Sequence, residues 1–225
     1  MGDVPKIVDH DQRRRDIVDA YLRVLARTGV AGTHGRSVAA DLGVVPGTLW
    51  HYFDSVEQIA EAAAQRGVER TLERIAARAG DARGLAALLA IAEEILPTSA
   101  VTREEARVVV AFWGQVHPGS DPRSAFGRTR EFTELTRTAL AQAVADGELA
   151  TTTPVEPLVR LLDSIYAGEQ VIWAAESVED DVSQVRATFA TAVLPWLGEN
   201  GSPATGTLQD WAGRDRIVDK CLRLR

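Results

Sequence analysis

The sequence is short of cysteine and of paired histidines, and each shortage excludes a class of site. A single cysteine, Cys221, excludes an intramolecular disulfide and a cysteine-cluster metal site. The four histidines are scattered, and no His-x3-His pair places two metal ligands on one face of a helix. We therefore expect no metal and no other cofactor.

Long apolar runs and catalytic motifs are also missing. No uninterrupted apolar run approaches 18 residues, which argues against a membrane-spanning helix. The first residues, MGDVPKIVDHDQRRR, lack the apolar core and small-residue cleavage site of a signal peptide. The chain has no Gly-rich phosphate loop, no nucleophile elbow and no Cys/His pairing. We expect a cytoplasmic protein that is not an enzyme.

The composition is that of a globular protein, with 45% hydrophobic and 25% charged residues. Its 225 residues suffice for one domain, or for a small domain followed by a larger one. Taken alone, the net charge of −7 argues against a protein that binds nucleic acid, but the acidic residues are unevenly distributed along the chain. Residues 1–80 hold eleven Lys/Arg and eleven Asp/Glu, whereas residues 81–225 hold 14 against 21. The densest basic cluster, Arg13–Arg15, lies in the balanced first part.

Apolar residues recur at spacings of three and four, and proline and glycine fall between the resulting segments. No segment sustains an alternation of period two, so the predicted fold class is all-α. The pattern predicts nine helices, at 11–27, 35–42, 46–53, 55–79, 82–96, 103–117, 122–146, 154–175 and 179–197. We divide the chain into an amino-terminal unit at 1–54, a helical bundle at 55–198, and a linker and tail at 199–225. The tail is either a short helix docked on the bundle or a mobile segment.

Two of the short predicted helices, 35–42 and 46–53, are joined by a turn that contains a glycine, which is the arrangement of a helix-turn-helix. In the second helix Leu49 and Phe53 are four residues apart, so we expect them to point inward. The outward positions are then Gly47, Thr48, Trp50, His51 and Tyr52. Aromatic residues are common in cores, so packing of the aromatic side chains on neighbouring helices is the alternative.

The segment at 13–59 resembles the amino-terminal domain of the TetR family of one-component transcriptional regulators. It reads RRRDIVDAYLRVLARTGVAGTHGRSVAADLGVVPGTLWHYFDSVEQI, and its most specific piece is ADLGVVPGTLWHYF. The resemblance implies a homodimer that places its third helix in the major groove of a palindromic double-stranded DNA operator. It also implies a small-molecule effector that releases a repressor from that operator. The alternative is a helical dimeric interaction protein that has lost operator binding.

The resemblance assigns DNA contacts to the start of the third helix, where small residues let the backbone approach a phosphate. Thr48 is the candidate for a base contact, and Trp50 and His51 are flat donors suited to phosphate and sugar. Thr33 either caps the second helix or donates to a phosphate. The full set of candidates is Arg36, Thr33, Val45, Pro46, Gly47, Thr48, Trp50, His51 and Tyr52.

Three positions depart from the family pattern. Trp50 stands where the family often has tyrosine, Val56 where it usually has lysine, and Gly35 where it has an apolar residue. Together these departures suggest weaker electrostatic anchoring on DNA. Arg13–Arg15 either compensate by contacting phosphate or form a solvated surface.

The bundle is expected to hold a ligand cavity with apolar walls and a few polar groups. Glu169 stands out, because a buried carboxylate needs a partner, either a cationic ligand or an arginine such as Arg107 or Arg130. His117 alternatively caps the end of its helix, and the aromatic residues are alternatively core. The candidate lining is Phe112, Trp113, Val116, His117, Phe126, Tyr166, Glu169, Gln170 and Trp173.

The last two predicted helices of the bundle, 154–175 and 179–197, carry broad apolar faces. In the TetR family two such helices meet their two-fold copies in a four-helix dimer interface, and the alternative is that these faces form internal core. The candidate interface residues are Leu158, Leu161, Leu162, Ile165, Val185, Phe189 and Val193.

Overall fold

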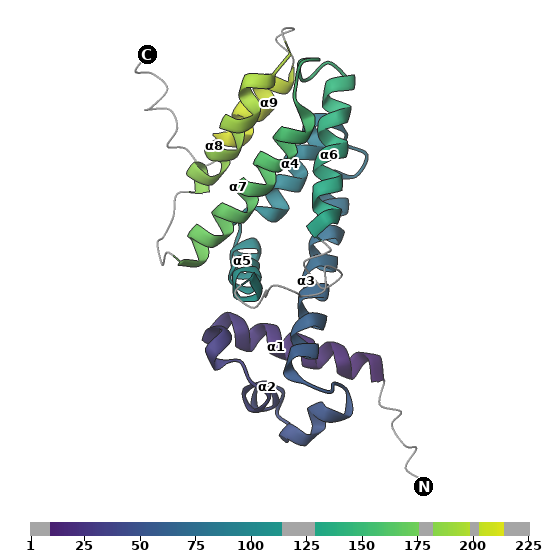
Figure 1. Ribbon diagram of the computed structural model, residues 1–225, viewed down its shortest axis with the longest axis vertical. Helices are drawn as coiled ribbons and strands as arrows, with labels where there is room; N and C mark the ends of the chain where they lie inside the picture. Colours follow the sequence, from purple (N-terminus) through teal and green to yellow (C-terminus); the bar gives the residue numbers. More distant parts are fainter. Residues whose placement is uncertain (1–9, 114–128, 176–181, 199–202, 214–225) are drawn as a thin grey trace.

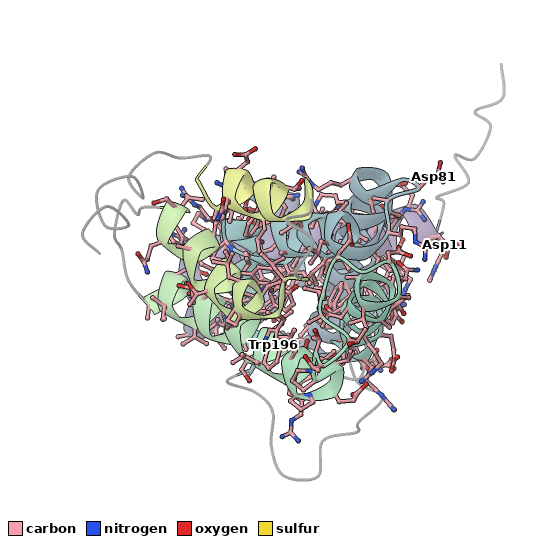
Figure 2. All side chains as sticks on the ribbon, turned by 90° about the horizontal axis from the view of Figure 1, so that it is seen from above. Asp11, Asp81 and Trp196 are labelled. Carbon is pink, nitrogen blue, oxygen red and sulfur yellow. The ribbon has the colours of Figure 1, made fainter. Side chains whose placement is uncertain are left out.

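The computed structural model describes residues 10–113, 129–175, 182–198 and 203–213 (Figure 1). In these ranges the regular elements are helices, and one isolated β-bridge joins Leu149 to Leu197. The predicted all-α class is confirmed. Seen along the long axis, side chains fill the space between the helices of the body, and charged groups lie at its outside (Figure 2).

The amino-terminal unit consists of α1 (His10–Gly32), α2 (Gly35–Leu42) and the 3-10 helix η1 (Pro46–His51). The regular helix of α1 is interrupted at Gly29, whose φ of 66° and ψ of −176° are not helical and suit glycine, and a second short helical stretch continues to Gly32. The predicted end at 27 lies close to this interruption. The prediction of an α-helix at 46–53 is corrected to a 3-10 helix. It has only six residues, begins with a proline and closes with an i to i−3 bond, from Tyr52 N–H to the Leu49 carbonyl at 3.0 Å.

A separate small core holds this unit together. Leu49 and Phe53 are 0% and 2% exposed and pack with Ile17 and Val38, which confirms the predicted inward face. Two ion pairs fasten α1 to α2, because Asp41 accepts from Arg23 at 2.9 Å and from Arg27 at 3.1 Å. The exposed side of η1 is therefore held by a rigid support.

Helix α3 (Val56–Ala79) rises from this unit into the body (Figure 1). Ser55 caps its first turn by accepting from the Gln58 N–H at 3.3 Å. The other helices of the body are α4 (Gly84–Ile95), α5 (Ala100–Trp113), α6 (Thr129–Ala145), α7 (Val155–Ala175) and α8 (Val182–Val193), with the 3-10 helix η3 (Leu194–Trp196). The predicted helical stretches at 114–117, 122–128 and 179–181 lie outside the described residues.

No helix in the described ranges is by itself long and apolar enough to cross a membrane. One bent pair, Gly84–Ile95 with Ala100–Val110, meets the length and composition criteria together, with 68° between its halves.

Helix α9 (Pro203–Ala212) docks on α4 and α8, so the docked-helix alternative describes this part of the tail (Figure 1). Leu208 and Trp211 are 0% and 2% exposed and belong to the main core. The indole Nε1 of Trp211 donates to Glu93 Oε2 at 2.9 Å, and Arg186 Nη2 lies 2.6 Å from Glu93 Oε1. Burial raises the pKa of Glu93, but Arg186 and Trp211 outweigh it and hold the pKa below its usual value.

We predict that Trp211→Ala lowers the free energy of unfolding by about 3–5 kcal/mol, because it leaves a cavity and removes a hydrogen bond from a buried carboxylate. Urea unfolding at pH 7 measures the change. Gln209→Ala, at an exposed position of the same helix, is the matched control and should change stability by less than about 0.5 kcal/mol. Equal stability of both variants would mean that α9 does not support the body.

Candidate nucleic-acid interface and ligand cavity

The outer side of η1 presents most of the candidate DNA contacts. Val45 and Trp50 are 71% and 45% exposed, which is unusual for large apolar side chains. Thr48 and Tyr52 are half-buried, and the exposed members of the set are Arg36, Val45, Pro46, Gly47, Trp50 and His51. Apart from Arg36, which lies on α2, these residues belong to one continuous short segment that reaches the surface above Leu49 and Phe53.

The three departures from the family pattern meet at one point. A Cβ added to Gly35 would lie 2.9 Å from Cζ2 and 3.0 Å from Cη2 of Trp50, and 3.8 Å from Cγ2 of Val56. The indole therefore occupies the space that a side chain at position 35 would need. The packing alternative holds in part for Trp50, since one edge of the ring packs on α2 while the residue remains 45% exposed.

The first turn of α2 is capped by His34, which corrects the prediction for Thr33. The Ser37 N–H donates to His34 Nδ1 at 3.1 Å, and the His34 N–H donates to Ser37 Oγ at 3.0 Å. Thr33 Oγ1 instead donates at 2.7 Å to the carbonyl of Gly29, because the bend there brings the two groups together. Arg36 is exposed and makes no ion pair within the described ranges.

The basic cluster Arg13–Arg15 is partly used inside the protein. Arg14 donates to the carbonyl of Tyr52, and its guanidinium lies 4.0 Å from the ring centroid of Phe53. Arg14 thus secures the end of η1. Arg13 lies 3.9 Å from Asp16, and Arg15 donates to Gln12 at 2.8 Å, both within α1.

A cavity of about 690 Å³ lies between the amino-terminal unit and the body, and residues of α1, α3, α4, α5, α6 and α7 line it. This volume is in the usual range for small-molecule sites, roughly 300–1,000 Å³. Of the candidate ligand-binding residues, Tyr166 and Gln170 line the cavity. Side chains of five other candidates lie outside the described part of the chain: Phe112, Trp113, Val116, His117 and Phe126.

Glu169 and Trp173 do not line this cavity. Glu169 is half-buried, and burial raises its pKa while the Thr188 hydroxyl of α8 lowers it. It makes no ion pair with Arg107 or Arg130, the partners considered from the sequence, within the described residues. Trp173 packs under Arg103, whose guanidinium carbon is 4.4 Å from its ring centroid.

Sequence reasoning missed the charged wall of the cavity. Arg70 lies 2.8 Å from Asp19 of α1, and Arg74 lies 2.8 Å from Glu94 of α4 and 2.6 Å from Glu105 of α5. Arg78 adds a second pair to Glu94 at 2.5 Å. The signal was available, because arginines recur every four residues along α3 at Arg66, Arg70, Arg74 and Arg78.

The candidate dimer residues divide into two groups. Five of them, Leu158, Leu162, Val185, Phe189 and Val193, are at most 8% exposed and pack in the main core, so they are corrected to internal positions. The broad apolar faces of α7 and α8 are covered by α6, by α9 and by each other. Leu161 remains 47% exposed, and Ile165 is half-buried.

Solved structures with the same arrangement of helices include transcriptional regulators. A TetR-family regulator from Rhodococcus sp. matches with a TM-score of 0.71 and 19% identity, over 82% of this chain and 98% of that one. The chain has the TetR-family fold. A transcriptional regulator from Saccharomonospora viridis, solved in complex with choline, matches with a TM-score of 0.76 and 19% identity, over 84% of this chain and 100% of that one.

A relative of known annotation is the HTH-type transcriptional regulator PksA of Bacillus subtilis, 33% identical over 110 residues. The match spans 48% of this chain and 54% of PksA, so the chain spans about half the length of the curated relative it matches. No family model matches the chain.

We predict an energetic coupling between Gly35 and Trp50 in this TetR-type fold. Gly35→Ala should destabilise the protein by about 1–2 kcal/mol, because the new methyl group displaces the indole. In a Trp50→Ala background the same change should be neutral or stabilising, since alanine is the better helix former. A double-mutant cycle measured by chemical denaturation tests this, and additive effects would contradict the packing.

Proposed function

We propose that the protein is a dimeric, ligand-responsive transcriptional regulator that binds a palindromic DNA operator, as a repressor released by a small molecule. The observation that carries the proposal is the exposed segment of η1, which a dedicated core holds in a helix-turn-helix arrangement. The TetR-family fold and the similarity to PksA support it.

The proposed interface uses close contact more than charge. Gly47 has no side chain, and nothing lies within 4 Å of an added Cβ, so the backbone there is free to approach a phosphate. Thr48 follows it and is our candidate for a base contact. Trp50 and His51 are exposed beside it and suit the sugar-phosphate backbone, and Arg36 adds a positive charge at the start of α2.

The proposed dimer uses the exposed side of α7 and α8. Leu161, Val171 and Ile172 on α7 are 47%, 41% and 52% exposed, and Leu194, the first residue of η3 directly after α8, is 38% exposed. Several exposed large apolar side chains on one helix are typical of a surface covered by a partner. A second copy of the chain would cover them by two-fold symmetry.

The proposed control follows from the position of the cavity. Its walls include Asp19 of α1 and Arg70 of α3 as well as α5, α6 and α7, so a ligand there contacts elements of both parts of the chain. A dimer reads half-sites about 34–36 Å apart, and a small change in spacing prevents simultaneous docking. The ligand must bind the non-docking arrangement more tightly than the docking one. The choline complex of the S. viridis regulator supports a small-molecule effector.

An interaction protein without operator binding is the second candidate. The observation that favours it is the charge balance, because residues 1–80 carry no net positive charge and Val56 replaces a family lysine.

We predict selective binding of one palindromic fragment from the region around the coding locus, measured by fluorescence anisotropy at low and moderate salt. Thr48→Ala with Trp50→Ala should weaken this binding at least about tenfold, since each lost contact is worth roughly 1–3 kcal/mol. Glu73→Ala, at an exposed position of α3, is the control and should bind normally. Equal, weak binding of every fragment by all variants would favour the interaction protein.

We predict that Leu161→Asp with Ile172→Asp converts a dimer to a monomer, because two charges per subunit would be buried at the contact. Light scattering coupled to size exclusion measures the mass. Val30→Asp changes a similarly exposed apolar side chain on α1 and should leave the dimer intact. A dimer that survives the double substitution would place the interface elsewhere.

A further inference from the structure

All three arginines that line the cavity form ion pairs with carboxylates of the protein. Arg23 pairs with Asp41, Arg70 with Asp19, and Arg74 with both Glu94 and Glu105. Their positive charges are neutralised by carboxylates at 2.6–2.9 Å. The cavity wall formed by these groups therefore offers little to an anionic ligand.

Asp163 is the exception among the lining carboxylates that are not exposed. Its Oδ2 accepts a hydrogen bond from Thr133 Oγ1 at 2.9 Å, and it makes no ion pair within the described residues. Arg137 is the cation nearby, but it is held at 2.6 Å by Glu134 and at 2.7 Å by Glu156. Burial raises the pKa of Asp163, while Thr133 and Arg137 lower it. A partly desolvated carboxylate without a cation is a costly arrangement.

Tyr166 lies one turn after Asp163 on the same face of α7 and also lines the cavity. Its side chain is 5% exposed, and its hydroxyl has no partner of normal hydrogen-bond geometry among the described groups. Its ring stacks on Phe189, with 5.7 Å between centroids, so the side chain is fixed in place. An aromatic side chain of the cavity wall thus lies one turn from a carboxylate that makes no ion pair among the described residues.

The rest of the lining is largely apolar. It includes Leu22, Val68, Ile95, Val108, Phe132 and Ala167. A volume of about 690 Å³ admits a ligand much larger than a single small polar group. The body of a fitting ligand is therefore apolar and of considerable size.

We infer that the cavity binds an amphiphilic cation, with its positive group beside Asp163 and Tyr166 and its apolar body against α3 and α5. This inference rests on the proposed function for its regulatory meaning, but the binding itself does not depend on DNA. A cation supplies the counter-charge that Asp163 lacks, and aromatic rings add attraction for a cation.

The test uses two probes of the same shape and opposite charge, tetraphenylphosphonium and tetraphenylborate. Isothermal titration of the full-length protein should show binding of tetraphenylphosphonium at least about tenfold tighter than binding of tetraphenylborate. Equal affinities, or tighter binding of the anion, would overturn the inference.

Asp163→Asn keeps the shape of the side chain and should weaken tetraphenylphosphonium binding about tenfold or more. Glu73→Gln removes an exposed carboxylate of α3 that does not line the cavity and should change affinity less than twofold. Thermal unfolding of both variants confirms that they fold. An unchanged affinity in folded Asp163→Asn would also overturn the inference.

Measuring DNA binding together with probe binding distinguishes a failure of this inference from a failure of the proposed function. Cation binding that depends on Asp163, in a protein that captures no DNA fragment, supports the cation site and contradicts the proposed regulator. Selective DNA capture by a protein that does not distinguish the two probes supports the regulator and contradicts the cation site.

Discussion

The ion pairs along α3 join this helix to three of its neighbours, α1, α4 and α5. Arg70 ties this helix to α1, and Arg74 and Arg78 tie it to α4 and α5. The pairs are partly shielded from water, Glu94 being only 7% exposed, and removing one partner of such a pair leaves an uncompensated charge. The helix-turn-helix unit is held on the body by apolar packing of α1 against α3 and α5, together with the single Arg70–Asp19 pair.

The contact among Gly35, Trp50 and Val56 gives a physical reason for the three departures from the TetR pattern. Each substitution alone looks like a loss, since a lysine, an apolar side chain and a tyrosine are missing. Together they remove a positive charge and add a flat apolar surface, because the Trp50 indole packs against Gly35 and remains 45% exposed. If the unit binds DNA as proposed, its lack of net charge means that close fit contributes more to its affinity and phosphate attraction less.

The fold was predictable because local rules decide it: apolar spacing set the helices, and Leu49 and Phe53 face inward as that spacing requires. The caps were less predictable, since His34 competes with Thr33 for the first turn of α2 and only the bend at Gly29 decides between them. Tertiary placement was the least predictable. Phe189 and Leu162 have the spacing of a dimer face, yet α9 and α6 cover such faces within one chain. The unpaired state of Asp163 depends on which arginines other helices engage, and no local pattern contains that information.

Two arginines of α3 have two roles at once: they line the cavity, and they form the ion pairs that join α3 to its neighbouring helices. Arg70 and Arg74 line the cavity and at the same time hold α1, α4 and α5. Any tilt of α3 that changes the spacing of two recognition segments must therefore also change the shape and charge of the cavity wall. By reciprocity, a ligand that prefers one wall geometry favours one position of the amino-terminal unit. In the proposed regulator, coupling between ligand and DNA would run through α3, because Arg70 lines the cavity and also pairs with Asp19 of α1, a helix of the amino-terminal unit.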